Sequence, residues 1–252
     1  MAVERTQDQH FDEILSDYEA HYDDRYSQIY RQKFLYAPLF AGINFKGMNV
    51  LEAMCGSGQT TAYLLGEGAH VTGLDISPQS AARFSQRWPS CRGIASSILQ
   101  TDFEDNTFDC VVIIGGLHHV PQSLEIVTKE ICRILKPGGF FCFGEPHRGS
   151  FFDLIRRFWY RHDTLFTDSE EAIDIGALQK TNSARFRVLK EIYTGNIAYL
   201  LVLNSLIFRV SLSFKKIYSP SLFILEKMLA PFSGKITTCF ALCQWQKVEE
   251  SD

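Results

Sequence analysis

The chain has 252 residues and a formal net charge of −4 at pH 7. This length suits one large domain with a sizeable hydrophobic core, and the weak negative charge gives no electrostatic reason to expect a nucleic acid as partner. Seven cysteines are scattered along the chain, several of them inside apolar runs. We therefore expect reduced, buried thiols in a cytoplasmic protein, without a disulfide framework and without a metal site.

The first element in chain order is a predicted helix over residues 8–34. Within it, Tyr22, Tyr26 and Tyr30 repeat at four-residue spacing on one face. We expect residues 1–47 to form an N-terminal helical lid in which Tyr22 closes over a bound ligand. Packing of the same tyrosines in the core explains their spacing equally well, so the pattern leaves both roles open. The polar, acidic start shows no signal-peptide pattern.

Residues 48–146 alternate between strand-like and helix-like segments. The predicted strands cover residues 49–53, 70–74, 92–96, 108–114 and 140–144. The predicted helices between them cover residues 60–65, 78–86 and 124–135, and the Pro-Gly-Gly of "LKPGG" ends the last one. Strands that alternate with helices indicate an α/β fold with a parallel sheet and right-handed crossovers.

Beyond this segment the alternation stops. Residues 147–234 are expected to form a helical insertion and substrate lid with one strand over residues 185–193. Apolar helical material follows over residues 196–230, and we expect it to break at Pro220 because proline cannot donate the helical hydrogen bond. Residues 235–252 are expected to hold the last strand, from their alternation of apolar and polar residues, and a short tail.

The longest uncharged apolar run covers residues 192–208. It contains Gly195, Asn196 and Asn204, and it is shorter than the roughly 20 mostly apolar residues that a membrane-spanning helix needs. We therefore expect a buried or groove-lining helix and no transmembrane segment. Contact with a membrane surface is a weaker alternative.

The loop after the first predicted strand carries a ligand-binding signal. In "VLEAMCGSGQTT", the acid Glu52 precedes two glycines, Gly56 and Gly58. A dinucleotide fingerprint needs a third glycine where Thr61 stands, and a P-loop needs a lysine directly after its last glycine. The loop therefore lacks the residues of both phosphate-binding motifs, and a pyrophosphate ligand is disfavoured.

Two acids near this loop suggest a nucleoside. Asp75 ends the next predicted strand, where a carboxylate suits the two hydroxyls of a ribose. Glu52 can orient a cationic amino group or the loop backbone, and the glycines let the backbone approach a ligand closely. Together they fit a nucleoside with an amino-acid tail and no phosphate. Taken singly, Glu52 also suits a solvated strand end, Asp75 a helix N-cap, and the glycines a tight turn.

Four stretches in this order resemble the motifs of the class I S-adenosylmethionine-dependent methyltransferases, in the small-molecule branch that includes the ubiquinone and menaquinone enzymes. "VLEAMCGSG" resembles the first motif, and "GLDIS" resembles the ribose-binding strand end. "DNTFDCVVIIGGLHHV" resembles the fourth strand and its loop, and "ILKPGGFFCFGEP" resembles the fifth strand. The resemblance implies a seven-stranded, mostly parallel, doubly wound Rossmann-like sheet with an antiparallel last strand.

The resemblance further implies S-adenosylmethionine as cofactor and methyl transfer as activity. Residues 48–146 would form the cofactor-binding core. The residues expected to bind the cofactor are Glu52, Ala53, Met54, Cys55, Gly56, Gly58, Asp75, Ile76, Ser97, Ile98, Gly115 and Tyr22.

Three positions depart from the family pattern. Met54 stands where the first motif has a glycine, so the backbone there must tolerate a side chain. Ser96 or Ser97 stands where an acid commonly contacts the adenine amino group. A neutral hydrogen bond contributes about 1 kcal/mol, against about 1.5–3 kcal/mol for one to a charged group, so we expect weaker adenine binding. "TDF", residues 101–103, replaces the usual "LPF".

Histidines at two strand ends are candidates for the chemistry. An oxygen acceptor must lose a proton, and a histidine titrates near neutral pH. His118 and His119 follow the fourth predicted strand, and His147 follows the fifth together with Glu145. We expect one of the histidines to act as base or positioning group, although one of the adjacent pair also suits simple packing under the loop.

The acceptor is expected to be a small molecule, either a natural product or a lipid-linked or sugar intermediate. Nucleic acid is disfavoured because "GGLHH" stands where amino-methylating DNA enzymes carry an Asn/Asp-Pro-Pro-aromatic motif. Two alternatives remain: a protein of this fold that catalyses another step such as a cyclisation, and a non-catalytic binding member. The oligomeric state is left open.

Overall fold

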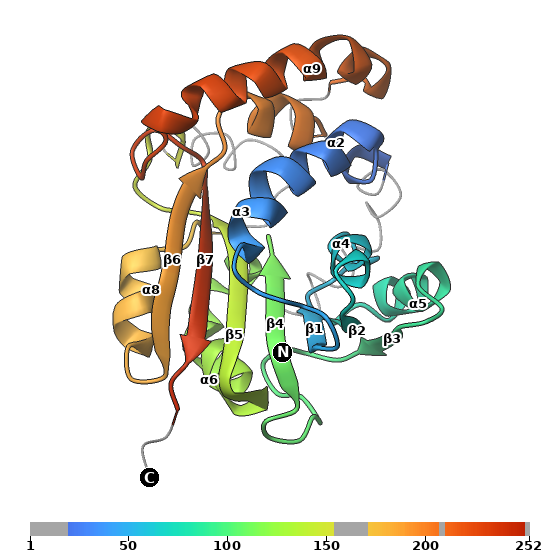
Figure 1. Cartoon of the computed structure of the whole chain (residues 1–252), viewed down its shortest axis with the longest axis vertical. Helices are drawn as coiled ribbons and strands as arrows, with labels where there is room; N and C mark the ends of the chain where they lie inside the picture. Colours follow the sequence, from blue (N-terminus) through green and yellow to red (C-terminus); the bar gives the residue numbers. More distant parts are fainter. Residues whose placement is uncertain (1–19, 154–170, 207–209, 250–252) are drawn as a thin grey trace.

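The computed structural model describes residues 20–153, 171–206 and 210–249 (Figure 1). A seven-stranded sheet forms its centre, in the order β3-β2-β1-β4-β5-β7-β6. The strands are β1 (Asn49–Ala53), β2 (His70–Asp75), β3 (Arg92–Ala95), β4 (Phe108–Ile114), β5 (Leu135–Pro146), β6 (Phe186–Thr194) and β7 (Phe240–Lys247). Pairing is parallel from β3 to β5, and β7 is antiparallel to both β5 and β6. The predicted doubly wound sheet with an antiparallel last strand is therefore confirmed.

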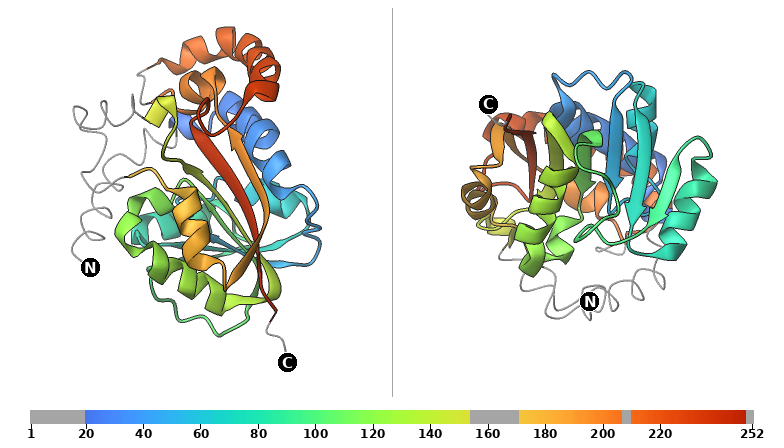
Figure 2. Two further views of the ribbon diagram at one scale, coloured as in Figure 1. Left: turned by 90° about the vertical axis from the view of Figure 1, so that its left-hand side faces the viewer. Right: turned by 90° about the horizontal axis from the view of Figure 1, so that it is seen from below.

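Helices cover both faces of this sheet (Figure 2). The α-helices are α2 (Arg25–Tyr30), α3 (Ala37–Phe40), α4 (Thr61–Gly66), α5 (Pro78–Arg87), α6 (Leu124–Ile134), α8 (Ile175–Asn182) and α9 (Leu212–Leu229). Alternate residues of β1, β4, β5 and β7 enter two separate cores, so that Val50 joins the core under α3, α4 and α5. Its neighbour Leu51 joins the core under α6 and α8. Such alternation is the pattern of a strand that is buried on both faces.

Short 3-10 and π segments complete the chain path. They are η1 (Arg31–Tyr36), η2 (Leu117–His119), η3 (Pro121–Ser123), η4 (Tyr199–Leu203) and η5 (Ala230–Phe232). The elements α2, η4 and α9 lie together at the end of the sheet toward which β4 points, and we call them the cap (Figure 1). The cap joins segments from both ends of the chain.

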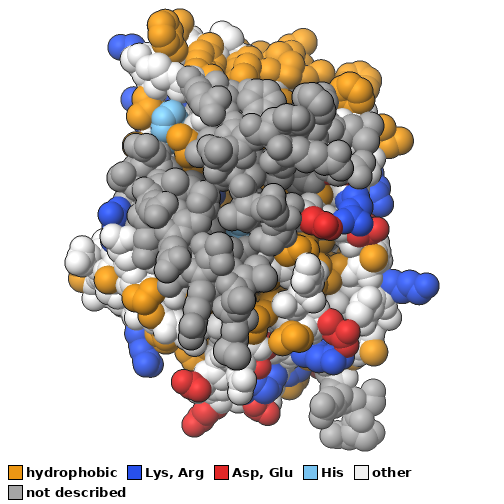
Figure 3. Space-filling view, turned by 180° about the vertical axis from the view of Figure 1, so that it is seen from behind, with side chains coloured by type: hydrophobic (Ala, Val, Ile, Leu, Met, Phe, Trp, Pro, Cys, Tyr) orange, Lys and Arg blue, Asp and Glu red, His pale blue; other side chains and the backbone are white. Residues whose placement is uncertain are grey.

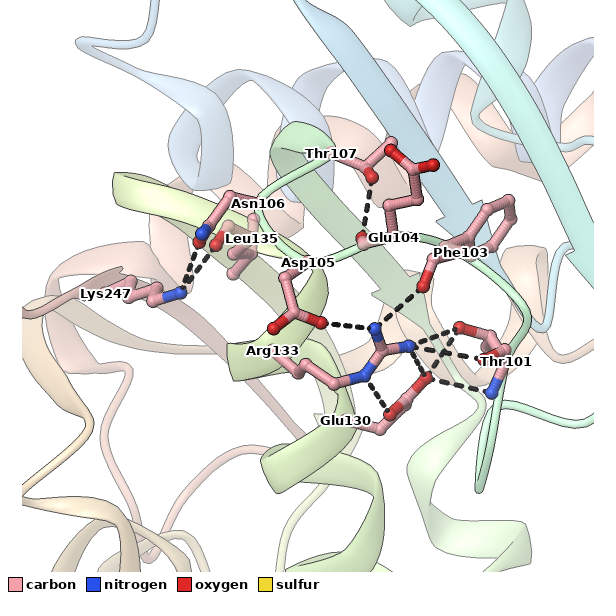
Figure 4. A network of polar contacts seen from close by, with 10 residues as sticks. All are labelled: Thr101, Phe103, Glu104, Asp105, Asn106, Thr107, Glu130, Arg133, Leu135 and Lys247. Atoms are coloured by element: carbon pink, nitrogen blue, oxygen red, sulfur yellow. Dashed lines mark hydrogen bonds and ion pairs between the residues drawn. The ribbon is translucent and has the colours of Figure 1, made fainter.

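The segment between β3 and β4 is fastened to the end of α6 by Arg133 (Figure 4). Its guanidinium donates to the carbonyl oxygen of Phe103 at 2.7 Å, and to the carboxylates of Glu130 and Asp105 at 2.7 Å each. Burial opposes the ionisation of Glu130, but hydrogen bonds from Arg133 and Thr101 outweigh it and leave its pKa below the ordinary value. The departure "TDF" thus lies in a structural network that holds the start of β4.

The predicted helix over residues 8–34 is only partly correct. Residues 8–19 lie outside the described part of the chain. The remaining helix is interrupted at residues 23–24, where Asp24 Oδ1 accepts from the backbone N–H groups of Tyr26 and Ser27 and starts α2. The helical path then continues to Phe40. An N-cap carboxylate satisfies helix-start donors and so favours a new beginning over continuation.

The predicted break at Pro220 is wrong, because α9 runs through this residue. Proline removes one N–H from the helix and leaves the carbonyl of residue 216 without its usual donor. Both Lys216 and Pro220 are exposed, so water can reach that carbonyl and the cost of the missing bond is small.

The last strand begins later than predicted, at Phe240, because Thr237 Oγ1 accepts from the N–H of Gly234 and closes a turn ahead of it. All seven cysteines are free. None of the helices in the described ranges is long and apolar enough to span a bilayer. The same ranges contain no group of three His, Cys, Asp or Glu side chains suited to a metal.

Candidate functional site

A pocket lies at the carboxyl ends of β1, β2, β3 and β4, where open α/β sheets bind ligands. Most of the predicted cofactor-binding residues line it: residues 52–56, Asp75, Ile76, Ser97, Ile98 and Gly115. His119 lines it as well. The structure therefore brings together, from four separate loops, the residues that the sequence patterns had singled out.

Asp75 holds the first loop in place. Its Oδ2 accepts from the backbone N–H of Gly56 at 2.8 Å, and its Oδ1 accepts from the N–H of Ser77 at 3.0 Å. Each carboxylate oxygen can accept more than one hydrogen bond, so these contacts leave capacity for a diol. The helix N-cap at this place is Ser77, whose side chain accepts from Ser80, so Asp75 does not serve as that cap.

Glu52 is buried beneath the same loop. Its Oε1 accepts from the backbone N–H of Thr60 at 2.9 Å, and its Oε2 accepts from the hydroxyl of Thr61 at 2.5 Å. Burial raises the pKa of this carboxyl to about 6, although the bonds from both threonines and the charge of Arg31 oppose the shift. Glu52 is therefore no solvated strand end, and at pH 7 it presents a carboxylate to the pocket.

The two glycines of the loop have different roles. A Cβ on Gly56, at φ +53°, would meet no atom within 4 Å, and the residue lines the pocket. A Cβ on Gly58, at φ +84°, would lie 2.5 Å from Trp88 Nε1 and 2.8 Å from Phe84 Cδ2. Gly56 thus exposes backbone to the pocket, whereas Gly58 lies outside its lining and is required for close packing of α5.

Met54 occupies the left-handed region, with φ +54°, which explains why the family usually has a glycine there. Its side chain reaches the loop after β4, where a Cβ added to Gly116 would lie 2.8 Å from Met54 Sδ. The methionine is therefore accommodated by a glycine in another loop. It links the loops after the neighbouring strands β1 and β4, both of which line the pocket.

Ser97 lines the pocket beyond β3, beside the buried side chain of Ile98. Its hydroxyl accepts from the backbone N–H of Leu99 at 3.1 Å. A hydroxyl can donate while it accepts, so a contact with a base edge is compatible with this bond.

Glu145 is the anchor of the loop after β4. Its side chain is fully buried, and Oε1 accepts from the N–H groups of Gly116 and Leu117 at 2.9 and 2.7 Å. Its Oε2 lies 2.8 Å from His118 Nδ1. Neither Glu145 nor His118 lines the pocket; the His118 ring instead packs on His119, with centroids 4.0 Å apart. Glu145 and His118 therefore position His119.

His147 lies away from the pocket and is 1 % exposed. Its ring nitrogens lie 3.0 Å from the carbonyl oxygen of Thr238 and 3.3 Å from that of Arg148, and the ring packs against Tyr193. Burial lowers the pKa of His147, which favours the neutral ring. The contacts describe a histidine that joins β5 to the segment before β7.

Tyr22 also lies outside the pocket lining. Its hydroxyl donates to Asn204 Oδ1 at 3.1 Å, so it fastens the N-terminal segment to the end of η4. Arg31 lines the pocket, although no sequence motif indicated it. Its side chain is buried, and its guanidinium carbon lies 5.6 Å from the centre of the Tyr22 ring. It donates to Gln59 Oε1 at 2.6 Å and so connects η1 to the glycine loop. An arginine within the predicted tyrosine-rich helix was the only signal.

Comparison with known proteins agrees with this geometry. A family model described as a methyltransferase domain matches residues 51–143. An uncharacterized methyltransferase from Synechocystis is 32% identical over 154 residues, which cover 59% of this chain and 72% of that protein. The demethylmenaquinone methyltransferase of Staphylococcus aureus is 37% identical over 100 residues, which cover 37% of this chain and 41% of the relative. The chain thus spans less than half of this second relative.

Solved structures share the fold at low sequence identity. A S-adenosylmethionine-dependent methyltransferase from Methanosarcina mazei has a TM-score of 0.61 at 18% identity, covering 86% of this chain and 100% of that one. The [4+2]-cyclase SpnF has a TM-score of 0.58 at 15% identity, covering 85% of this chain and 79% of that one. Taken with the sequence relatives, these findings show that the chain belongs to the S-adenosylmethionine-dependent methyltransferase family and uses S-adenosylmethionine as its cofactor.

Proposed function

We propose that the chain transfers a methyl group from S-adenosylmethionine to an oxygen of an apolar small molecule, with His119 as the base or positioning group. The observation that supports this most directly is that two kinds of group line the same pocket. Glu52 and Asp75 line it from the ends of β1 and β2, and His119 lines it from the loop after β4. Cofactor-holding residues and a candidate base therefore face one space.

The residues of the pocket fit the cofactor. Backbone at Gly56 faces open space, as a close ligand requires. The Asp75 carboxylate suits the ribose hydroxyls, the Glu52 carboxylate suits a cationic amino group, and Ser97 suits the base edge. Met54, Cys55, Ile76, Ile98 and Gly115 would supply the remaining contacts, whereas Gly58 and Tyr22 would act only through the packing of the loop and the cap.

The mechanism assigns distinct tasks to the residues of this chain. The bound cofactor supplies an activated methyl group whose leaving group is a neutral thioether. The walls of the pocket align the acceptor oxygen with the methyl carbon, and alignment alone can lower a barrier by several kcal/mol. His119 accepts the acceptor's hydroxyl proton on a ring nitrogen. The contacts of Glu145 with His118, and of His118 with His119, hold that ring in position.

The acceptor class is inferred from the relatives and from the lining of the pocket. The Staphylococcus relative is named for demethylmenaquinone. Apolar side chains of Ile98, Ile114 and Val120 line the pocket beside the predicted cofactor-binding residues. An apolar, hydroxyl-bearing acceptor, lipid-linked or of natural-product type, suits these surroundings better than a free sugar.

A cyclisation is the second candidate function, supported by the likeness in fold to SpnF. Transfer of a labelled methyl group separates the two functions. We expect label to move from methyl-labelled S-adenosylmethionine to a panel of quinols and other apolar hydroxyl compounds, and to move poorly to amines. Cofactor binding measured by calorimetry, without label transfer to any acceptor in the panel, would favour the second candidate.

The base assignment is tested by replacing His119 with alanine. General-base catalysis contributes about 10²–10⁴-fold, so His119→Ala should lower kcat at least about 100-fold. The calorimetric Kd for S-adenosylmethionine should change little. His118→Ala is the matched control: its ring is outside the pocket, so we expect a smaller loss in kcat. Transfer at the normal rate by His119→Ala would remove this residue as base.

A further inference from the structure

The helix α9 has its polar and apolar faces reversed relative to an ordinary surface helix. A surface helix normally buries an apolar stripe and exposes polar residues. The buried positions of α9 include Lys215, Ser219 and Glu226. Its outward positions include Ile217 and Ile224, which are 68% and 63% exposed. Lys215 and Glu226 face inward because they bind α2 and the segment before η4, and the isoleucines are left in solvent.

The exposed apolar side chains form one continuous surface. Ile217, Ile224 and Met228 are spaced by seven and four residues, so they lie on one line along the helix. Phe214 lies beside them, and Phe232 in η5 extends the surface past the helix end; these two are 60% and 76% exposed. Figure 3 shows hydrophobic side chains gathered along the top of the molecule, where α9 lies. Such a contiguous surface is typical of an interaction site rather than of scattered surface residues.

The charges of α9 select the kind of partner. Lys216 and Lys227 are exposed and lie together on one flank of the apolar line. Glu226 is the one acid in α9, and it is 2% exposed. The exposed charges of this helix are therefore all positive, although the chain as a whole carries −4.

We propose that this outward face of α9 docks on an anionic lipid surface, with the helix lying in the plane of the interface. Apolar side chains with a flank of lysines are what an interfacial helix presents to acidic headgroups and the acyl boundary. Self-association through this face would bring the lysines of two copies near each other without an opposite charge on α9 to pair with them. An anionic lipid surface supplies that opposite charge. The inference rests on the surface of α9 and is independent of the acceptor that we propose for the pocket.

The test is flotation of the full chain with lipid vesicles. Vesicles of phosphatidylcholine containing 30 % phosphatidylglycerol should bind the protein, and vesicles of pure phosphatidylcholine should bind it at least about tenfold more weakly, since attraction to acidic lipids contributes on the order of fivefold per lysine. Raising the salt from about 50 to 500 mM should release much of the bound protein, because salt screens exposed charges. Failure of wild-type protein to float with the anionic vesicles overturns the proposal.

Two double variants test the two components separately. Ile217→Ser with Ile224→Ser should lower the apparent affinity at least about tenfold, because both side chains would insert at the interface. Lys216→Gln with Lys227→Gln should lower it about 25-fold at low salt, at about fivefold per lysine. All four side chains are exposed, so folding, followed by thermal unfolding, should be unaffected.

Matched controls use exposed residues away from α9. Ile126→Ser on α6, at a position 52% exposed, and Lys46→Gln with Lys180→Gln should leave flotation unchanged. Equal losses in the controls and in the α9 variants would overturn the proposal. A wild-type dimer in sedimentation analysis, dispersed by the isoleucine variant without any vesicle binding, would assign this face to a second copy instead.

Discussion

The floor of the pocket and the cap both depend on buried polar side chains, but their partners are separated very differently along the chain. In the floor, formed by the loops after β1 and β2, Glu52 binds a residue 8 positions away, and Asp75 binds one 19 positions away. In the cap, the hydroxyl of Tyr30 donates to a carboxylate 196 positions away, on Glu226. Lys215 of the cap likewise binds Asp24, 191 positions away.

This difference separates two roles. The floor is organised by contacts within one strand–loop–helix unit and its neighbour, so its geometry depends little on the ends of the chain. The cap exists only when the N-terminal helices and α9 meet, and Lys215 adds bonds to the His21 carbonyl and the Ser27 hydroxyl at 2.8 and 2.9 Å. Substitutions in the cap should therefore affect stability, whereas substitutions in the floor should affect cofactor binding as well.

Removal of Glu226 should produce the largest effect. In α9, this carboxylate accepts from the Tyr30 hydroxyl at 3.0 Å and from the N–H groups of Asn196 and Ala198 at 2.8 and 3.0 Å. Glu226→Ala leaves these buried donors without a partner, at about 1–3 kcal/mol each, so the free energy of unfolding should fall by at least about 3 kcal/mol. Denaturant unfolding measures the loss. Glu226→Gln keeps an acceptor oxygen and should lose less; a wild-type value for the alanine variant would contradict the role given to the cap.

Alanine substitutions at the two glycines of the floor should affect different properties: Gly58→Ala should mainly lower stability, and Gly56→Ala should mainly weaken cofactor binding. Gly58→Ala places a Cβ 2.5 Å from Trp88 Nε1 at positive φ, so the unfolding free energy should fall by about 2–3 kcal/mol. Gly56→Ala meets no atom and should cost about 1 kcal/mol, from backbone strain alone. Calorimetric titration should nevertheless show the weaker S-adenosylmethionine binding in the folded Gly56 variant, because its new methyl group would occupy open space at a residue that lines the pocket. Equal cofactor affinity in the Gly56 variant and wild type would argue against this assignment.

Glu52 should make stability depend on pH. Its pKa is raised to about 6 in the folded chain, so its contribution to stability is fully present below about pH 4.3 and is lost as the pH rises through 6. The shift from the ordinary value of 4.5 corresponds to about 2 kcal/mol. Relative to the isosteric Glu52→Gln, wild type should therefore lose about 2 kcal/mol between pH 4 and pH 7.5, measured by denaturant unfolding. A constant difference between the two proteins across this range would show that burial does not raise this pKa.

Met54 should show the smallest effect on stability. Met54→Gly relieves a left-handed residue but gives the unfolded chain more freedom, and these terms of about 1 kcal/mol oppose each other. We expect a net change within about 0.5 kcal/mol in thermal unfolding. Asn106→Gly, at φ +56° and remote from the pocket, is the control for the backbone effect, and it additionally removes the acceptor of the Lys247 hydrogen bond. A change in cofactor Kd in the Met54 variant alone would show that the side chain shapes the cofactor's binding site.

The sequence patterns predicted the sheet more accurately than the cap. The bounds of β1 and β4 are as predicted, because apolar runs bounded by turn residues are local signals. The helix break expected at Pro220 did not occur, since the cost of proline depends on whether water reaches the freed carbonyl. Likewise, the interruption at Asp24 occurs because its carboxylate accepts hydrogen bonds from the first N–H groups of α2, which a periodic sequence pattern does not indicate.

The candidate site shows the same division. Glu52, Asp75 and His119 were found by their positions at strand ends, and the structure places all three around one pocket. Glu145 was expected to take part in the chemistry beside His147, yet it holds the loop of His118 instead. Glu52, Asp75 and Glu145 all lie at strand ends, so their positions in the sequence look alike. The loop that each carboxylate binds depends on which strands are neighbours in the folded sheet. Glu145 of β5 binds the loop after β4, whereas Glu52 of β1 binds the loop after its own strand.

The sequence by itself determined the strand–loop–helix order, the chemistry of the loop that lines the pocket, and the class of ligand it suits, because each is encoded within a few consecutive residues. The tertiary structure alone decided that Arg31 enters the pocket, that Tyr30 meets Glu226, and that α9 turns its isoleucines outward. These features join residues whose separation along the chain exceeds any local pattern. Hydrogen-bond partners and exposed faces at that range are set only when distant segments pack together.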